Sequence, residues 1–159
     1  MLTEAQDFSI DPEGSIRSKA AIYLYGKEVN PETYAICKAD MLIRGQDISH
    51  IVLGNTLSDD GLLGKLFDYM LSNPPFGVDW KQQQKVIVSR HEKAPKDSPW
   101  SAGLPRVNDG SLLFLQHMIS KFEEVDPKAQ KYGSRAAIVF SGSPLFTGGA
   151  GGGESNIRK

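Results

Sequence analysis

The sequence of 159 residues has few cysteines, no long apolar runs and no excess of positive charge. Its single cysteine, Cys37, excludes an internal disulfide and is typical of a reducing compartment, so we expect a cytoplasmic location. No apolar run is long enough to span a membrane. The first residues lack the basic and apolar regions of a secretion signal. The formal net charge of −1 argues against unaided DNA binding, which usually needs a basic excess.

Two kinds of site are also missing from the sequence. His91 has no Cys or His partner at a metal-binding spacing, so we predict no metal site. The glycine-rich run 147–153 contains no Gly-Lys-Ser or Gly-Lys-Thr, which excludes a phosphate-binding P-loop. The chemistry must therefore be sought elsewhere in the chain.

Strand-like apolar runs alternate with helix-like periodic segments along the chain. This alternation predicts an α/β fold in which a mostly parallel sheet is doubly wound, with helices on both faces. A single domain is expected over residues 1–159. We expect strands near 20–25, 50–54, 66–71 and 135–140, and helices near 31–44 and 110–122.

The helix boundaries have local signals. Asn30 is a good N-cap, Pro31 is a good first helical residue, and Gly45 is a credible stop for the helix over 31–44. Asp109 is expected to cap the second helix. The residues expected to face the core from that second helix are Leu112, Leu115, Ile119 and Phe122.

Two segments lack a clear periodic pattern. Residues 1–19 are polar and are expected to be irregular or helical. Residues 77–108 contain three prolines and scattered charges, and are expected to form a long loop. We expect Trp80 and Trp100 to pack this loop down onto the domain rather than to stack on a ligand.

The most informative stretch is Asn73-Pro74-Pro75-Phe76, which follows a predicted strand. The carboxyl ends of strands are where open α/β sheets bind ligands. An Asn carbonyl, prolines that offer only carbonyl acceptors, and an aromatic face together suit a planar group with an exocyclic NH₂, such as adenine. An ordinary Asn-Pro turn with a buried Phe is the alternative, and for the dipeptide alone it would be favoured.

This tetrapeptide resembles the catalytic motif of DNA methyltransferases that make N6-methyladenine. With the flanking blocks, the chain resembles the modification (M) subunit of type I restriction-modification systems. The resemblance covers nearly the whole chain from about Leu24. The flanking blocks are Leu24–Thr33 (LYGKEVNPET), Leu53–Leu57 (LGNTL), Asp109–Met118 (DGSLLFLQHM) and Gly142–Gly148 (GSPLFTG).

The resemblance implies a Rossmann-like fold that uses S-adenosylmethionine as cofactor. It makes Asn73, Pro74, Pro75 and Phe76 catalytic residues acting on a flipped adenine of double-stranded DNA. It also implies that Glu28 binds the cofactor ribose, with Val29 against the adenine and Asn55-Thr56 at the adenine edge. Two alternatives stay open, because Glu28 could be a solvated loop residue and Asn55 could only shape a turn.

The resemblance further implies an incomplete domain. The first strand with its glycine-rich loop and the last strands of the family fold are not found in the sequence, so we expect the isolated chain to bind cofactor weakly. The expected partners are specificity (S) and restriction (R) subunits and a second M subunit, with no membrane. A catalytically inactive association module and a protein-glutamine N-methyltransferase are the alternatives; the latter usually has Tyr at the position of Phe76.

Overall fold

The computed structural model describes residues 1–11, 13–14, 21–94, 96, 98–149 and 153–159. By its internal packing the chain divides into two compact units, Met1–Leu62 and Leu63–Lys159, and each is described by itself. Both units mix helices and strands, as the α/β prediction requires. Within the described ranges, no helix has the length and apolar character needed to cross a membrane.

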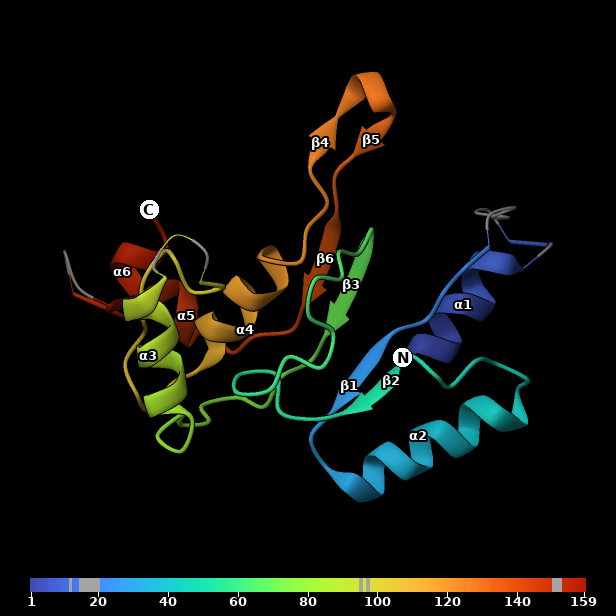
Figure 1. Cartoon of the computed structure of the whole chain (residues 1–159), viewed down its shortest axis with the longest axis horizontal. Coiled ribbons are helices and arrows are strands. Elements are labelled where there is room, and N and C mark those ends of the chain that lie inside the picture. Colours follow the sequence, from blue (N-terminus) through green and yellow to red (C-terminus); the bar gives the residue numbers. More distant parts are fainter. Residues whose placement is uncertain (12, 15–20, 95, 97, 150–152) are drawn as a thin grey trace. The chain divides into compact units, whose positions relative to one another are not determined.

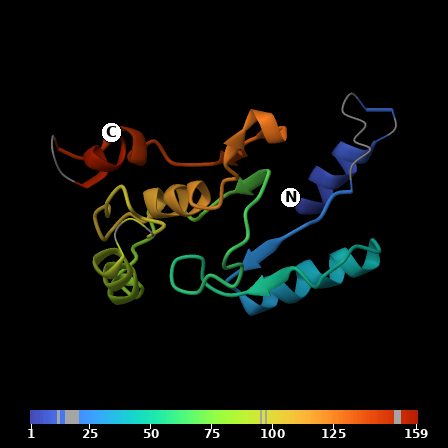
Figure 2. The same cartoon turned by 45° about the horizontal axis from the view of Figure 1, so that its top comes forward.

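The first unit is built on two parallel strands and a helix that covers one face of them (Figures 1 and 2). In the register of this pair, Glu28 lies opposite Leu53, so both strands end at the same edge. Among the described residues of this unit, the buried apolar side chains are Met41, Ile51 and Leu57. Its elements are α1 (Leu2–Ile10), β1 (Gly26–Glu28), α2 (Pro31–Ile43) and β2 (Ile51–Leu53).

Helix α2 begins and ends as predicted. The Asn30 side chain accepts hydrogen bonds from the backbone N–H groups of Glu32 and Thr33, and Pro31 is the first helical residue. At the other end Gly45 has a φ of 69°, a conformation that glycine adopts without steric cost. The N–H of Gln46 then reaches the Met41 carbonyl at 2.9 Å, which completes a Schellman motif.

The strand predicted at 20–25 was placed too early, because β1 occupies Gly26–Glu28 and residues 21–25 are not in a strand. Ala20 lies outside the described residues. Gly26 was taken as the residue that ends the strand, whereas it begins the strand. A Cβ on Gly26 would lie 3.0 Å from Ile51 Cδ1 and 3.2 Å from Leu2 Cδ1, so glycine permits a close approach inside the pair.

The second unit contains a parallel pair, β3 with β6, and an antiparallel hairpin, β4 with β5. The hairpin, orange in Figure 1, extends beyond one end of the β3–β6 pair. The two strands predicted near 66–71 and 135–140 therefore form a parallel pair, as expected, whereas the hairpin was not predicted. The elements are β3 (Tyr69–Ser72), α3 (Gln84–Lys93), α4 (Ser111–Ile119), β4 (Val125–Asp126), η1 (Pro127–Ala129), β5 (Lys131–Tyr132), β6 (Arg135–Ile138), α5 (Ser143–Phe146) and α6 (Gly153–Ile157).

Strand β3 differs from the buried strand that was predicted. Tyr69 is 71% exposed and Leu71 is 49% exposed, so the strand alternates between exposed and half-buried residues. Successive side chains of a strand point to opposite faces, so Tyr69 and Leu71 share the more exposed face of the β3–β6 pair. Phe67, at the start of the predicted range, instead forms a bridge to Phe122 outside the strand.

Helix α4 is shorter than predicted, and its buried face is rotated. The N-cap is Gly110, while the Asp109 carboxylate accepts a hydrogen bond from the Ser111 N–H. Ile119 was expected to face the core but is exposed. The buried face runs through Leu112, Leu113 and Gln116, because the preceding segment packs there.

Residues 77–108, expected to be one irregular loop, contain the ten-residue helix α3. Both tryptophans are buried, as expected, with Trp80 2% exposed and Trp100 0% exposed. Each indole N–H donates to a backbone carbonyl, Trp80 to Arg106 at 3.0 Å and Trp100 to Leu113 at 3.2 Å. Trp100 therefore ties the segment to α4, whereas Trp80 bonds within the segment itself.

Candidate active site

The residues predicted to act in function lie at the carboxyl ends of two parallel strand pairs. Glu28 and Asn55 follow β1 and β2 in the first unit. Asn73 follows β3 in the second unit. Each group is therefore at the kind of strand edge where open α/β sheets bind ligands.

Glu28 is the last residue of β1 and is half-buried. Its Oε1 accepts a hydrogen bond of 2.9 Å from the N–H of Asn30, the N-cap of α2. Among the described residues no hydrogen bond reaches Oε2, so one carboxylate oxygen is available to a ligand. Val29 follows and is 60% exposed, which leaves an apolar surface beside that carboxylate.

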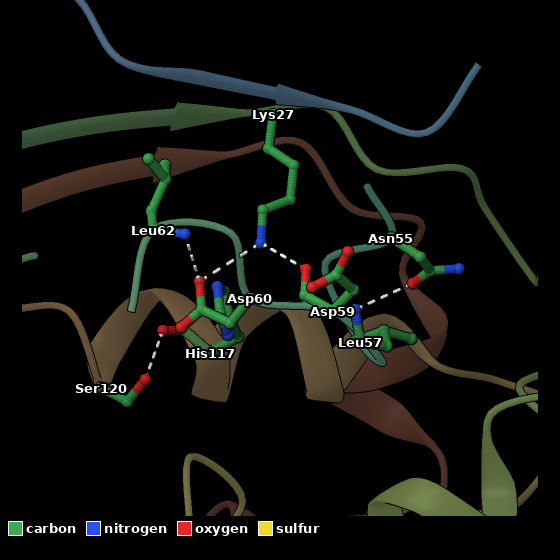
Figure 3. Close-up of polar contacts among 8 residues, drawn as sticks. All are labelled: Lys27, Asn55, Leu57, Asp59, Asp60, Leu62, His117 and Ser120. Atoms are coloured by element: carbon green, nitrogen blue, oxygen red, sulfur yellow. Dashed lines mark hydrogen bonds and ion pairs between the residues drawn. The ribbon is translucent and has the colours of Figure 1, made fainter. Parts of the chain in front are cut away.

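The loop after β2 lies next to Glu28, because the N–H of Gly54 donates to the Glu28 carbonyl at 2.9 Å. The side-chain oxygen of Asn55 accepts from the Leu57 N–H at 2.9 Å, which forms an Asx turn (Figure 3). The turn-shaping role of Asn55 is thus confirmed. Its amide nitrogen points away from that turn (Figure 3), and Thr56 beside it is half-buried.

Asn73 is exposed and comes directly after the last residue of β3. Within the described part of the chain, its side chain has no hydrogen-bond partner. An Asn that only initiated a turn would use its side-chain oxygen on a backbone N–H, as Asn30 and Asn55 do. Within the described residues, the Asn73 side chain therefore forms no Asx turn of the kind that Asn30 and Asn55 form.

The rest of the tetrapeptide divides into a buried and an exposed part. Pro74 is buried, whereas Pro75 is exposed and Phe76 is 54% exposed. The buried-Phe alternative is therefore wrong for this chain. Gly77 follows with a φ of 62° and turns the backbone away from the strand. An exposed aromatic ring thus follows, three residues along the chain, an Asn side chain that has no hydrogen-bond partner among the described residues.

The chain beyond this turn is fixed to the start of α4. The N–H of Gly110 donates to the Val78 carbonyl, and the N–H of Trp80 donates to the Val107 carbonyl, both at 3.0 Å. A Cβ on Gly110 would lie 3.4 Å from that Val78 carbonyl, so this junction is tight. The tetrapeptide is consequently held at both ends, by β3 before it and by this junction after it.

One part of the site was missed by the sequence analysis. Lys27, between Gly26 and Glu28, turns its side chain into the loop after β2 and pairs with Asp60 (Figure 3). No sequence pattern links residues 27 and 60, which are neighbours only because β1 and β2 are parallel. For metal binding, the described residues contain no group of three or more His, Cys, Asp or Glu side chains that could hold an ion.

Comparison with known proteins identifies the family. A sequence model of the family described as N-6 DNA methylase matches residues 1–159, the whole chain. The chain therefore belongs to the N-6 DNA methylase family.

Individual relatives agree with this assignment. The methylase subunit of the type I restriction enzyme HindI from Haemophilus influenzae is 25% identical over 118 residues, which cover 73% of this chain and 24% of that subunit. The MjaVII methylase subunit from Methanocaldococcus jannaschii is 25% identical over 140 residues, 87% of this chain and 22% of that subunit. The resemblance to type I methylase subunits is confirmed, and the chain spans about a quarter of their length.

A solved structure gives the same fold. The methyltransferase subunit of a type I restriction-modification system from Streptococcus thermophilus matches with a TM-score of 0.68 and 23% identity. The match covers 99% of this chain and 30% of that chain. The chain therefore shares its fold with the part of that structure that it matches.

Proposed function

We propose that the chain carries the adenine-binding and cofactor-binding core of a DNA adenine-N6 methyltransferase that uses S-adenosylmethionine. The observation that supports this best is the exposed Asn73 amide at the end of β3, unpaired within the described residues, three residues before the exposed ring of Phe76. Membership of the N-6 DNA methylase family supports the reaction class. We further propose that the chain is part of a doubly wound, Rossmann-like fold.

The proposed chemistry follows from the hydrogen-bond acceptors that Asn73 and Pro74 offer to an adenine amino group. A target adenine has to leave the base stack before a protein group can reach its amino nitrogen. Phe76 then stacks on the extruded base, and the Asn73 side-chain oxygen and the Pro74 carbonyl accept the two amino hydrogens. These acceptors orient the nitrogen lone pair and stabilise the positive charge that develops on N6. The step needs no covalent intermediate with the protein.

The cofactor would be held at the edge shared by β1 and β2, where it supplies the methyl group. The free oxygen of Glu28 suits a pair of ribose hydroxyls, as acidic residues do at this place in nucleotide-binding sheets. Val29 offers apolar surface for the adenine ring. Asn55 and Thr56 lie one strand away and present polar groups to the ring edge.

The proposed setting is a type I restriction-modification complex. A chain with a net charge of −1 lacks the basic surface that usually grips DNA. We propose that specificity and restriction subunits and a second methylase subunit surround it, and that the specificity subunit brings the double-stranded DNA.

The direct test is transfer of tritiated methyl groups from S-adenosylmethionine to unmethylated DNA. The chain is assayed alone and in the enzyme assembled with a specificity subunit. Label that appears in N6-methyladenine supports the proposal. An assembled complex that forms but transfers no label would favour the inactive association module.

Glu28→Ala should weaken cofactor binding by about 1–3 kcal/mol, because a hydrogen-bonded charged acceptor is lost. Calorimetry with S-adenosylmethionine measures the change. Glu32→Ala removes an exposed carboxylate from the first turn of α2 and serves as the matched control. An unchanged affinity for Glu28→Ala would assign Glu28 to the solvated-loop interpretation, since its bond to the Asn30 N–H is local.

Phe76→Ala should weaken capture of the extruded base by about 1–3 kcal/mol, the usual contribution of one stacked base. Phe76→Tyr and Phe76→Trp keep an aromatic face and should have smaller effects. Fluorescence of 2-aminopurine at the target position reports base extrusion. Phe8→Ala changes another exposed phenylalanine, on α1, and should have no effect. Equal losses in both variants would contradict a stacking role.

A further inference from the structure

A buried ion pair joins β1 to the loop after β2. The Lys27 side chain is 8% exposed and that of Asp60 is 10% exposed. The ammonium lies 3.2 Å from Asp60 Oδ1 and donates to the Asp59 carbonyl at 2.8 Å (Figure 3). One side chain from the strand thus holds two consecutive residues of the loop.

These bonds continue to Asn55. The Asp59 N–H donates to the Asn55 carbonyl at 2.8 Å, and the Leu57 N–H donates to the Asn55 side-chain oxygen at 2.9 Å. At the other end, the Leu62 N–H donates to the Asp60 carboxylate at 3.2 Å. Lys27 is therefore connected through backbone hydrogen bonds to a residue proposed to contact the cofactor.

Two glycines let this loop close tightly. A Cβ on Gly54 would lie 3.1 Å from Asp59 Oδ2, and a Cβ on Gly61 would lie 3.2 Å from Val52 Cγ2. Both distances are shorter than ordinary van der Waals contact, so a side chain at either position would push its neighbour aside. Glycine at both positions lets Gly54 approach Asp59 and lets Gly61 approach Val52.

A gain in folding stability does not by itself explain why Lys27 and Asp60 form a buried ion pair. Removing two charges from water is costly, and apolar residues of similar size often stabilise a protein as well as a buried ion pair does. A buried pair is better suited to selecting one geometry among several. Here that geometry places the loop beside Glu28, the residue that directly follows Lys27.

We propose that Lys27 is a positioning residue for cofactor binding, acting through Asp59 and Asp60 to fix Asn55 beside Glu28. This inference rests on the proposed function for the identity of the ligand. Its structural part, that Lys27 orders residues 54–62, stands independently of any ligand. The two parts can therefore be tested separately.

The first arm measures backbone order in the full chain without ligand. In Lys27→Met, amide hydrogen exchange at Leu57 and Asp59 should be at least about tenfold faster, because these donors belong to one hydrogen-bond network. Lys38→Met, the same chemical change on α2, should leave these amides unchanged. Unchanged exchange at Leu57 and Asp59 in Lys27→Met overturns the proposal.

The second arm measures binding of tritiated S-adenosylmethionine by equilibrium dialysis. Lys27→Met should lower the affinity about tenfold, within the range for residues in one network, and Lys27→Arg should recover most of it. In an Asn55→Ala background the Lys27→Met effect should shrink to about twofold or less. An equal effect in both backgrounds, or none in either, means that Lys27 does not act through Asn55 and overturns the proposal.

The double variant Lys27→Met/Asp60→Asn separates positioning from stability, because the side-chain oxygen that it keeps at position 60 can still accept from the Leu62 N–H. It removes both charges, so its thermal stability should return close to that of the unmodified chain. Its affinity should stay low, because the Asp59 carbonyl has lost its donor. Recovery of affinity in the double variant overturns the positioning role. If the unmodified chain binds no S-adenosylmethionine, the proposed function fails for it, and the exchange arm decides the inference.

Discussion

Asn73→Ala should reduce the rate of methyl transfer about 100-fold or more, while affinity for S-adenosylmethionine stays the same. The Asn73 oxygen matters most when the adenine amino group becomes tetrahedral and positively charged, so its loss affects the transition state more than the bound substrate. Loss of one such preorganised group costs on the order of 10²- to 10³-fold in other enzymes. The cofactor residues Glu28 and Asn55 lie on different strands from Asn73 and should act independently of it.

Single-turnover kinetics on a hemimethylated duplex measure the methyl-transfer step separately from binding and product release. Asn108→Ala is a matched control, because Asn108 is also exposed and has no hydrogen-bond partner among the described residues. It should transfer methyl at the unmodified rate. A normal rate for Asn73→Ala would mean that Asn73 only shapes the turn after β3.

The sequence predicted the fold well where local signals are strong. Helix α2 carries an N-cap, a proline at its first position and a glycine stop, and all three act as expected. The strands at Ile51–Leu53 and Arg135–Ile138 fall within the predicted ranges. Strand β1 was misplaced because the apolar run before Gly26 looked more strand-like than Gly26–Glu28 itself. Pairing with β2 overrides that local preference.

The candidate site was predictable only in part, for a related reason. Asn73 was found because its tetrapeptide directly follows a predicted strand, and Glu28 was found through the resemblance of its flanking block, so both depended on local sequence. The contact between Lys27 and Asp60 depends on the parallel pairing of β1 with β2, and no periodic pattern records it. The buried face of α4 could not be predicted from its own sequence either. Leu113 and Gln116 are bonded to Trp100 and Gly103, which come from a preceding segment.

The burial of Trp100 has the largest expected consequence for stability. Its ring is fully buried, and its indole N–H donates to the Leu113 carbonyl of α4. Nearby, the Gln116 side chain donates to the Gly103 carbonyl at 3.1 Å. These contacts hold the segment after α3 onto α4. The same helix is preceded by the Gly110 junction that fixes the chain after the tetrapeptide.

Trp100→Ala should therefore lower the free energy of unfolding by about 3–5 kcal/mol, the usual cost of truncating a buried aromatic residue. That is a large share of a typical domain stability of about 5–15 kcal/mol. Urea unfolding followed by circular dichroism measures it, because Trp80 is the only other tryptophan and fluorescence would change with the substitution itself.

Trp100→Phe separates packing from hydrogen bonding. It keeps an aromatic ring in the same space and loses the indole donor, so the loss should be smaller than for Trp100→Ala. Phe146→Ala removes an aromatic ring that is 85% exposed, and we expect it to change stability by less than about 0.5 kcal/mol. If Trp100→Ala unfolded at the same urea concentration as Phe146→Ala, Trp100 would not anchor the segment. The chain after the tetrapeptide would then be held by the backbone bonds of Val78 and Trp80 and by the buried Trp80 indole.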